Sequence, residues 1–496
     1  MVNSWATFGV DLHLEPTGPG LRRGLTDALR EAVRTGRLAP GTRLPPSRSL
    51  AADLGIARNT VADAYADLVA EGWLTARQGS GTRVAAGVAT GAASPHGEPS
   101  PSGAAFPPGA PAGSGVRPGS AAAPATTGPV SRPHEPDRPV HDLRPGMPDL
   151  ASFPRTEWLK AARRALNSAP YHAFGYGDPR GRIELRTALA GYLARARGVR
   201  TDPERILVCG GISHGLKILG TVLAARGVPT VAVESYVLRW HRALLGAAGL
   251  SDTPLPFDEL GTDPGELSDE GAVLLTPAHQ FPMGVPLHRD RRAAVVEWAR
   301  RTGGLVVEDD YDGEFRYDRQ PVGALQGLDP EHVVYLGTAS KSLAPGLRLA
   351  WMALPPGLAG EAVEAKGGID TCGVLDQLTL AEFIASGAYD RHIRAARLRY
   401  RRRRDALVAE LARRAPSVRA TGIAAGLHVV LRLPSGTEQA TLRAAAWHGL
   451  AVDGLHRHRH PDATAEPCDA LVVGYGTPPD HAWSAALDAL CAALPE

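Results

Sequence analysis

Hydrophobic residues show two different spacings along the chain. Near the N-terminus, apolar residues recur at every fourth position, at Leu21, Leu25, Leu29 and Val33. This spacing predicts an amphipathic helix. A short helix capped by Ser47 and a third helix over about 59–71, ended by Gly72, follow it. The segment WLTARQGSGTRVA then predicts two short strands. This order of helix, helix–turn–helix and hairpin is that of a winged helix–turn–helix.

The second pattern extends over the C-terminal part of the chain. Short apolar runs alternate there with helical stretches: RILVCGG, PTVAVES, AVLLTP, GLVVEDD and HVVYLGTAS. Strands that alternate with helices predict an α/β domain with a mainly parallel sheet. Functional groups of such a domain are expected where the strands end, at the carboxyl edge of the sheet.

A segment of different composition separates the two parts. Residues 85–140 contain 12 Pro and 9 Gly but no Leu or Ile. Such a segment cannot bury enough apolar surface to offset its ordering entropy, so we predict a flexible linker. The expected organisation is a DNA-binding domain over 1–84, the linker over 85–140 and an effector domain over 141–496.

Composition excludes several classes of protein. The formal net charge is +2, from 54 basic and 52 acidic residues, which argues against a polycationic nucleic-acid coat. The four cysteines lie far apart without a CxxC pair, which argues against a zinc ribbon or a disulfide scaffold. Neither a secretory signal nor an apolar run of ~18 residues is present, so we expect a cytoplasmic protein. His456, His458 and His460 alternate without accompanying acids or cysteines, so no metal site is predicted.

The start of the third helix carries the side chains that predict DNA binding. Arg58 can read guanine, Asn59 can read adenine or cap the helix, and Thr60 can reach a phosphate. The full set of expected DNA contacts is Arg43, Ser47, Arg48, Arg58, Asn59, Thr60, Arg77, Ser80 and Thr82. The string LPPSRSLAADLGIARNTVADAYADLVAEGWL resembles the GntR-type winged helix–turn–helix. That resemblance implies a bacterial transcription regulator that binds operator DNA as a dimer.

Lysine is rare, and one lysine lies in a dense motif. Only four of the 54 basic residues are lysines, and Lys341 lies in GTASKSLAPGLRLAW beside Thr338, Ser340 and Arg348. Asp309 ends a predicted strand 32 residues earlier and is followed by Tyr311. Pyridoxal phosphate needs a lysine for its aldehyde, a carboxylate for its ring nitrogen and donors for its phosphate. These residues supply all three.

Those motifs, together with YGDPRG, GGISHGLKIL and TPAHQFPMGVPLHRDRR, resemble fold-type I aminotransferases. Joined to the DNA module, they resemble the MocR subfamily of GntR regulators. The resemblance implies a multidomain fold: a winged helix–turn–helix plus an α/β PLP-dependent transferase domain. It makes Lys341 the Schiff-base lysine and Tyr176 an aromatic residue that reaches the neighbouring subunit's phosphate. The cofactor contacts that it implies are Lys341, Asp309, Tyr311, Thr338, Ser340, Arg348, Ile212, Ser213, Tyr176 and His279.

Two departures from the aminotransferase pattern bear on activity. Gapless placement puts Leu238 where an aromatic residue stacks on the cofactor, and Tyr236 where a proline is usual. The C-terminal strand DALVVGYG lacks the arginine that holds a substrate carboxylate; Arg457 and Arg459 are the available substitutes. We therefore expect a homodimeric regulator that senses pyridoxal phosphate, or an adduct of it with an amine or amino acid. A catalytically active aminotransferase is the alternative.

One further segment has a separate expectation. HIRAARLRYRRRRDAL, over 392–407, carries seven arginines on a predicted helix with Leu398 and Leu407 buried. We expect its arginines to form a solvated face, and a second DNA contact is the alternative.

Overall fold

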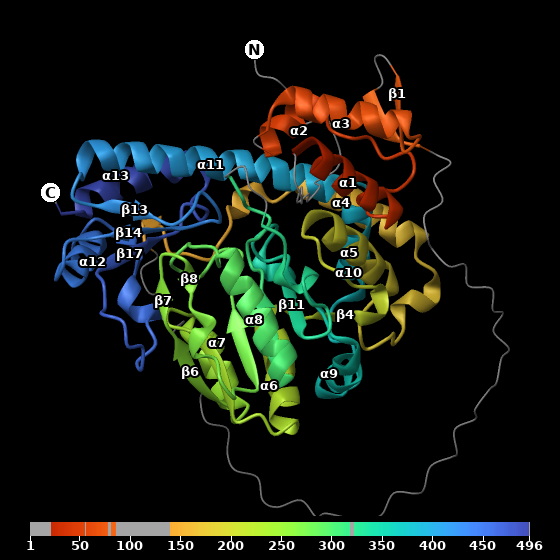
Figure 1. The fold of residues 1–496 in the computed structure, drawn as a ribbon. Helices are drawn as coiled ribbons and strands as arrows, with labels where there is room; N and C mark the ends of the chain where they lie inside the picture. The colour runs from red at the N-terminus through yellow and green to blue at the C-terminus, as the bar shows by residue number, and fades with distance from the viewer. Residues whose placement is uncertain (1–20, 55, 78–80, 86–138, 318–321, 496) are drawn as a thin grey trace, which may run out of the picture.

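A computed structural model describes residues 21–54, 56–77, 81–85, 139–317 and 322–495. The N-terminal part contains α1 (Leu21–Arg34), α2 (Ser47–Leu54), α3 (Arg58–Ala70), β1 (Leu74–Arg77) and β2 (Gly81–Val84), as Figure 1 shows. β1 and β2 pair antiparallel as the expected hairpin. Almost all of the predicted linker lies outside the described residues.

The N-terminal helices have a core of their own. Leu25, Leu29 and Val33 of α1 are buried against Val61 and Leu68 of α3, as the four-residue spacing predicts, whereas Leu21 at the start of the pattern is 58% exposed. Two ion pairs also join α1 to α3. Arg22 Nε donates to Asp67 Oδ2 at 2.8 Å, and Arg30 Nη2 donates to Glu71 Oε2 at 2.7 Å. These exposed pairs add little stability, so apolar burial holds the helices together.

The C-terminal part is built on a seven-stranded sheet in the order β4-β12-β11-β10-β9-β5-β6. Its strands are β4 (Ile206–Cys209), β5 (Thr230–Glu234), β6 (Ser251–Leu255), β9 (Ala272–Leu275), β10 (Leu305–Asp309), β11 (Val333–Thr338) and β12 (Ala350–Ala353). All neighbours pair parallel except β12, which runs antiparallel to β11 and β4. The expected mainly parallel sheet is confirmed.

Helices cover both faces of this sheet. They are α4 (Arg155–Ser168), α5 (Ile183–Ala196), α6 (Ile212–Ala225), α7 (Arg239–Ala247), α8 (Arg289–Thr302), α9 (Ala359–Ala365) and α10 (Val374–Ala385). Successive strand residues point to opposite faces. In β4, Ile206 and Val208 therefore join the core under α5 and α10, whereas Leu207 and Cys209 join the core under α6 and α9. Burial on both sides explains the uninterrupted apolar runs in the sequence.

A second, antiparallel sheet has the order β13-β14-β17-β16. It contains β13 (Arg419–Thr421), β14 (Val429–Arg432), β16 (Asp453–Gly454) and β17 (Ala470–Val473), next to α12 (Glu438–Trp447) and α13 (Trp483–Ala493). Two short pairs complete the strands: β3 (His141–Asp142) with β15 (Leu450–Ala451), and β7 (Phe257–Asp258) with β8 (Gly261–Thr262). No described helix is both long and apolar enough to cross a membrane.

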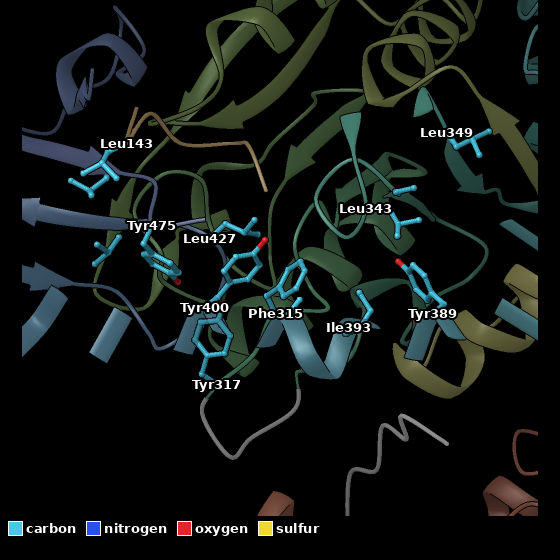
Figure 2. Close-up of a cluster of buried hydrophobic side chains, with 14 of the residues drawn as sticks. Leu143, Phe315, Tyr317, Leu343, Leu349, Tyr389, Ile393, Tyr400, Leu427 and Tyr475 are labelled. Atoms are coloured by element: carbon cyan, nitrogen blue, oxygen red, sulfur yellow. The ribbon is translucent and has the colours of Figure 1, made fainter. Parts of the chain in front are cut away.

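The long helix α11 (Ala388–Arg414) runs between the α4 and α10 region and the small sheet (Figure 1). Its Tyr400 meets Phe315 edge to face at 5.4 Å between ring centroids, within the cluster drawn in Figure 2. The expected solvated arginine face of α11 is wrong in part. Arg394 and Arg403 are buried, and Arg403 donates to Asp149 at 3.1 Å and to the Tyr475 carbonyl at 3.1 Å. Arg403 lies on the same buried face of α11 as Tyr400 and Leu407, so this face packs on the core and not against solvent.

Candidate cofactor cavity and DNA-binding surface

A cavity of about 400 Å³ lies where β10 and β11 end and α6 begins. This is the carboxyl edge of the large sheet, where open α/β folds bind ligands. Eight of the ten expected cofactor contacts line it: Ile212, Ser213, Asp309, Tyr311, Thr338, Ser340, Lys341 and Arg348. The volume lies within the usual range for small-molecule sites.

Lys341 follows β11 and reaches across to the segment that precedes α4. Its Nζ donates to the Gly146 carbonyl at 2.6 Å. Burial lowers the pKa of Lys341, against the opposing charges of Asp309 and Asp312. A lower pKa leaves more of the amine neutral, which is the nucleophilic form that condenses with a carbonyl. The cavity therefore holds an amine suited to a Schiff base.

Asp309 ends β10 and is only 3% exposed. Its Oδ1 is buried and has no hydrogen-bond partner among the residues that the structure describes, and its Oδ2 lies 3.9 Å from Nδ1 of His241. Burial raises the pKa of Asp309 to about 7, although Lys341 opposes the shift. Buried polar atoms are nearly always paired in proteins, so an unpaired carboxylate oxygen at a cavity marks the place of a ligand donor. A protonated pyridine nitrogen is such a donor, so this residue fits the cofactor.

Tyr311 connects the cavity to a buried pair of residues. Its hydroxyl donates to the His279 carbonyl at 3.1 Å and lies 3.1 Å from His279 Nδ1. That same nitrogen lies 2.9 Å from Oδ2 of Asp312. Burial, with the charge of Asp312 as the next cause, raises the pKa of Tyr311 well above its ordinary value, so its hydroxyl stays protonated. His279 does not line the cavity, and it orients Tyr311 instead of facing a ligand.

The N-terminus of α6 and the loop after β11 form a cradle for an anion. Gly211 caps α6 with φ 92°, and a Cβ there would lie 2.6 Å from Nη2 of Arg348. Arg348 itself has φ 52° and donates to the Gly210 carbonyl at 2.5 Å. Thr338 Oγ1 donates to Ser340 Oγ at 2.9 Å. A helix N-terminus beside a guanidinium and two hydroxyls is suited to a phosphate.

The other side chains considered for contacts with the cofactor lie in different places. Tyr176 is fully exposed and lies outside the cavity lining. Tyr236 is buried beside Cys468, whereas Leu238 lines the cavity at the start of α7. The sequence reasoning missed Trp240, which also lines the cavity and donates from Nε1 to Ser213 Oγ at 3.0 Å. The one sequence signal for Trp240 is that it is an aromatic residue two positions after Leu238, where an aromatic residue was expected.

Neither candidate for holding a carboxylate lies in the cavity lining. Arg457 pairs with Asp453, and Arg459 donates to the carbonyls of Ala463 and Ala465. Of the described lining residues, Arg348 alone is an arginine, and it belongs to the anion cradle. The sequence around Arg457 and Arg459 has no periodic pattern from which the partners of these two side chains could be predicted.

The three alternating histidines do not converge. His456 lies 3.1 Å from Asp469 through Nε2, His458 lines the cavity, and His460 lies 3.5 Å from Asp252. The expectation that acids would be lacking here is wrong. Acidic side chains approach each of these histidines: Asp469 lies near His456, Asp453 near His458 and Asp252 near His460.

The DNA module exposes the start of α3. Arg58 and Asn59 are exposed there, and so is Arg48 on α2. Neither arginine makes an ion pair or side-chain hydrogen bond with the described residues. The N-cap of α3 is Ala57, so the capping interpretation of Asn59 is wrong. Ser47 is the first helical residue of α2 and not its cap.

The wing lies beside the turn that precedes α2. The backbones of Arg43 and Arg83 form a β-bridge, and Leu44 N donates to the Thr82 carbonyl at 2.9 Å. Thr60, on the first turn of α3, is partly buried. The side chain of Arg77 and all of Ser80 lie outside the described residues. A contiguous surface therefore joins α2, the start of α3 and the described part of the wing.

Comparison with known proteins decides the family. Residues 21–84 match the family described as bacterial regulatory proteins, gntR family, and residues 141–454 match aminotransferase class I and II. The chain belongs to the MocR group of GntR regulators. It is 33% identical over 470 residues to the probable rhizopine catabolism regulatory protein MocR of Rhizobium meliloti, covering 92% of this chain and 90% of that protein. It is 31% identical over 465 residues to the pyridoxine biosynthesis transcriptional regulator PdxR of Corynebacterium glutamicum, covering 93% of each.

Solved structures confirm the fold of the C-terminal part of this MocR-type regulator. A multiple substrate aminotransferase from Thermococcus profundus is similar with a TM-score of 0.65 and 25% identity, over 73% of this chain and 92% of that one. Pyrococcus horikoshii kynurenine aminotransferase gives a TM-score of 0.64 at 25% identity, over 72% and 90%. Class I and II aminotransferases are a PLP-dependent family, so the MocR-type chain joins a DNA-binding module to a fold made for that cofactor.

Proposed function

We propose that this MocR-type regulator binds pyridoxal phosphate at Lys341 and controls its binding to operator DNA through that site. The observation that carries the proposal is the unpartnered, buried Oδ1 of Asp309 at the cavity that Lys341 lines. When bound, the cofactor supplies an aldehyde that condenses reversibly with primary amines. Asp309 would hold its ring nitrogen, Tyr311 its phenolic oxygen, and the cradle around Arg348 its phosphate.

The chain's own residues prepare this site before any ligand arrives. The Gly146 carbonyl holds the Lys341 amine at 2.6 Å, on the side from which it can reach the cavity. Asp309 and Lys341 each oppose the shift that burial causes in the pKa of the other. Tyr311 stays protonated, and its single O–H, which donates to the His279 carbonyl here, would turn from that carbonyl to donate to a ligand oxygen. Such preorganisation lowers the entropic cost of binding.

The DNA-binding half of the proposal rests on the surface around α3. Arg48 and Arg58 are exposed and unpaired among the described residues, whereas Arg22, Arg30 and Arg34 are held by carboxylates. Arginines free of internal partners remain available to phosphates and base edges. We propose that a homodimer presents two copies of α3 to repeated half-sites in the operator.

Homodimer formation is supported by a segment that exposes large aromatic side chains. Tyr171, Phe174 and Tyr176 lie within six residues and are 91%, 51% and 103% exposed. Exposed apolar clusters mark protein interfaces. In the proposed dimer Tyr176 reaches the neighbouring subunit's phosphate cradle. Binding of the cofactor, or of its adduct with an amine, would favour one arrangement of the paired DNA modules over another.

Footprinting of the full chain, loaded with pyridoxal phosphate, on the DNA upstream of its own coding sequence tests the regulator function. We expect protection of repeated half-sites. Arg58→Ala should weaken operator binding by about 1–3 kcal/mol if it reads a base, whereas Arg34→Ala, whose side chain pairs with Glu31 on α1, should leave it unchanged. Absence of sequence-selective protection would contradict the proposal.

A further inference from the structure

The second sheet contributes an Asp–His pair to the cavity wall. Asp453 lies on β16 and His458 ends the short helix that follows it, and both line the cavity together with Lys341. The side chain of His458 is 6% exposed, and its buried Nε2 has no hydrogen-bond partner within the described part of the chain. Phe281 packs edge-on against it at 5.2 Å between ring centroids and fixes its orientation. An unsatisfied buried nitrogen at a cavity marks a place for a ligand group.

In the His458 tautomer that carries its proton on Nδ1, the two side chains offer a pair of hydrogen-bond acceptors. Nε2 of His458 lies 3.9 Å from Oδ2 of Asp453, which is too long for a hydrogen bond between them. Burial, with Arg457 as the second cause, lowers the pKa of His458 to about 4, so the imidazole is neutral at physiological pH. Arg457 binds the other carboxylate oxygen, Oδ1. One ammonium group, with charge-assisted bonds of about 2.8 Å, can donate to both free acceptors at once.

The same wall is unsuited to a carboxylate. Asp453 pairs in register with Val472 of β17, the strand in which the aminotransferase pattern places a carboxylate-binding arginine. All four residues of β17 are buried and apolar. The guanidinium of Arg348 is committed to the anion cradle, and Arg457 is already paired with Asp453, so an amino-acid carboxylate would find no free arginine among the described lining residues.

We propose that Asp453 and His458 form an ammonium subsite, and that the effector is a primary amine with a second cationic amino group and no carboxylate, such as a linear diamine. The inference rests on the proposed function, because the first amine of the effector is expected at the Lys341 end of the cavity. It identifies the effector class from the hydrogen-bond acceptors of the wall. Discrimination follows because the acceptor pair suits an ammonium group, whereas a carboxylate would meet two acceptors and no free arginine.

Calorimetric titration of the full chain loaded with pyridoxal phosphate tests the subsite. The probes are the linear diamines from 1,3-diaminopropane to 1,6-diaminohexane, each compared with the monoamine and the ω-amino acid of the same chain length. At the best length, we expect the diamine to bind at least ~10-fold more tightly than the monoamine, about 1.4 kcal/mol. The ω-amino acid should bind more weakly than the monoamine. Equal or tighter binding of the ω-amino acid would overturn the subsite.

Two substitutions test whether the preference for diamines over monoamines arises at this subsite. Asp453→Asn and His458→Leu should each bring the ratio of diamine to monoamine affinity toward one, while monoamine binding is retained. Retained cofactor absorbance and thermal melting show that each variant is folded. Asp252→Asn is the matched control, because Asp252 and His460 form a second Asp–His pair outside the cavity lining. An undiminished diamine preference in both cavity variants would overturn the assignment.

The outcomes separate this inference from the proposed function. If pyridoxal phosphate does not attach to Lys341, the proposed function fails and the subsite fails with it. If the cofactor attaches and alters operator binding, but diamines show no advantage over monoamines, the regulator stands and the ammonium subsite is wrong.

Discussion

Asp309→Asn should stabilise the cofactor-free protein while weakening its hold on pyridoxal phosphate. Asp309 is 3% exposed, and burial raises its pKa from 3.8 to about 7. One pKa unit corresponds to about 1.4 kcal/mol, so the ionised carboxylate costs the folded state about 4 kcal/mol at pH 8. Asparagine removes the charge but buries an amide that lacks a partner, which costs about 1–3 kcal/mol. The expected net gain in unfolding free energy is about 1–3 kcal/mol.

The pH dependence follows from the direction of the shift. Because the folded-state pKa of Asp309 is raised, the unfolded chain loses this proton at lower pH than the folded chain. The cost to the wild-type protein is therefore absent below pH ~4, grows as pH rises, and is complete above pH ~7. Urea denaturation of both cofactor-free proteins should show a larger difference at pH 8 than at pH 5.5.

Cofactor affinity should change in the opposite direction. A hydrogen bond to a charged group contributes about 1.5–3 kcal/mol, so Asp309→Asn should lose about 10- to 150-fold in affinity for pyridoxal phosphate. Glu308→Gln is the control, because Glu308 accepts from the backbone N–H groups of Leu325 and Gln326 and does not line the cavity. Its cofactor affinity should stay unchanged. Unaltered affinity of Asp309→Asn, with no gain in stability at pH 8, would refute the reasoning.

Three further predictions concern the same cavity. Lys341→Ala should abolish covalent trapping of the cofactor by borohydride, and peptide maps that place the wild-type label on another lysine would contradict the assignment. Gly211→Ala should reduce cofactor affinity about 10-fold, because its φ of 92° is strained for alanine and its Cβ would lie 2.6 Å from the Arg348 guanidinium; Gly227→Ala, also at positive φ but with open space around it, should not. Release of keto acids from common amino acids should stay below ~1 s⁻¹, the lower end of ordinary enzyme rates, and faster turnover would move the protein to the enzyme class.

Local sequence patterns were sufficient to predict the elements of the N-terminal module and five strands of the large sheet. The third helix, expected over about 59–71, is α3 (Arg58–Ala70), and the residue expected to end it, Gly72, has φ 82°. Each of the five apolar runs became a strand of the large sheet. The antiparallel β12 was not predicted, because its apolar run of four residues overlaps the end of the Lys341 motif and is too short to indicate a strand by itself. Pairing direction is a tertiary property that the run itself does not encode.

The residues that line the cavity could be predicted only where they belong to a recognisable sequence motif. Lys341, Asp309 and the anion cradle follow from motifs with chemical meaning. Asp453 on β16 and His458 at the end of the next short helix belong to no chemical motif, and the pairing of β16 with β17 places this stretch at the cavity. The buried arginines of α11 were missed for a similar reason. Their carboxylate and carbonyl partners lie far away in the sequence, as Asp149 does for Arg403.

Operator affinity measured as pyridoxal phosphate is added to the cofactor-free protein tests the central claim most directly. Fluorescence anisotropy with the footprinted operator should change at least ~5-fold in affinity between the cofactor-free and saturated protein, the lower range of allosteric coupling. Lys341→Ala should lose this response, whereas Lys160→Ala, an exposed lysine paired with Glu157, should keep it. The same operator affinity with and without the cofactor in the wild-type protein would contradict the account.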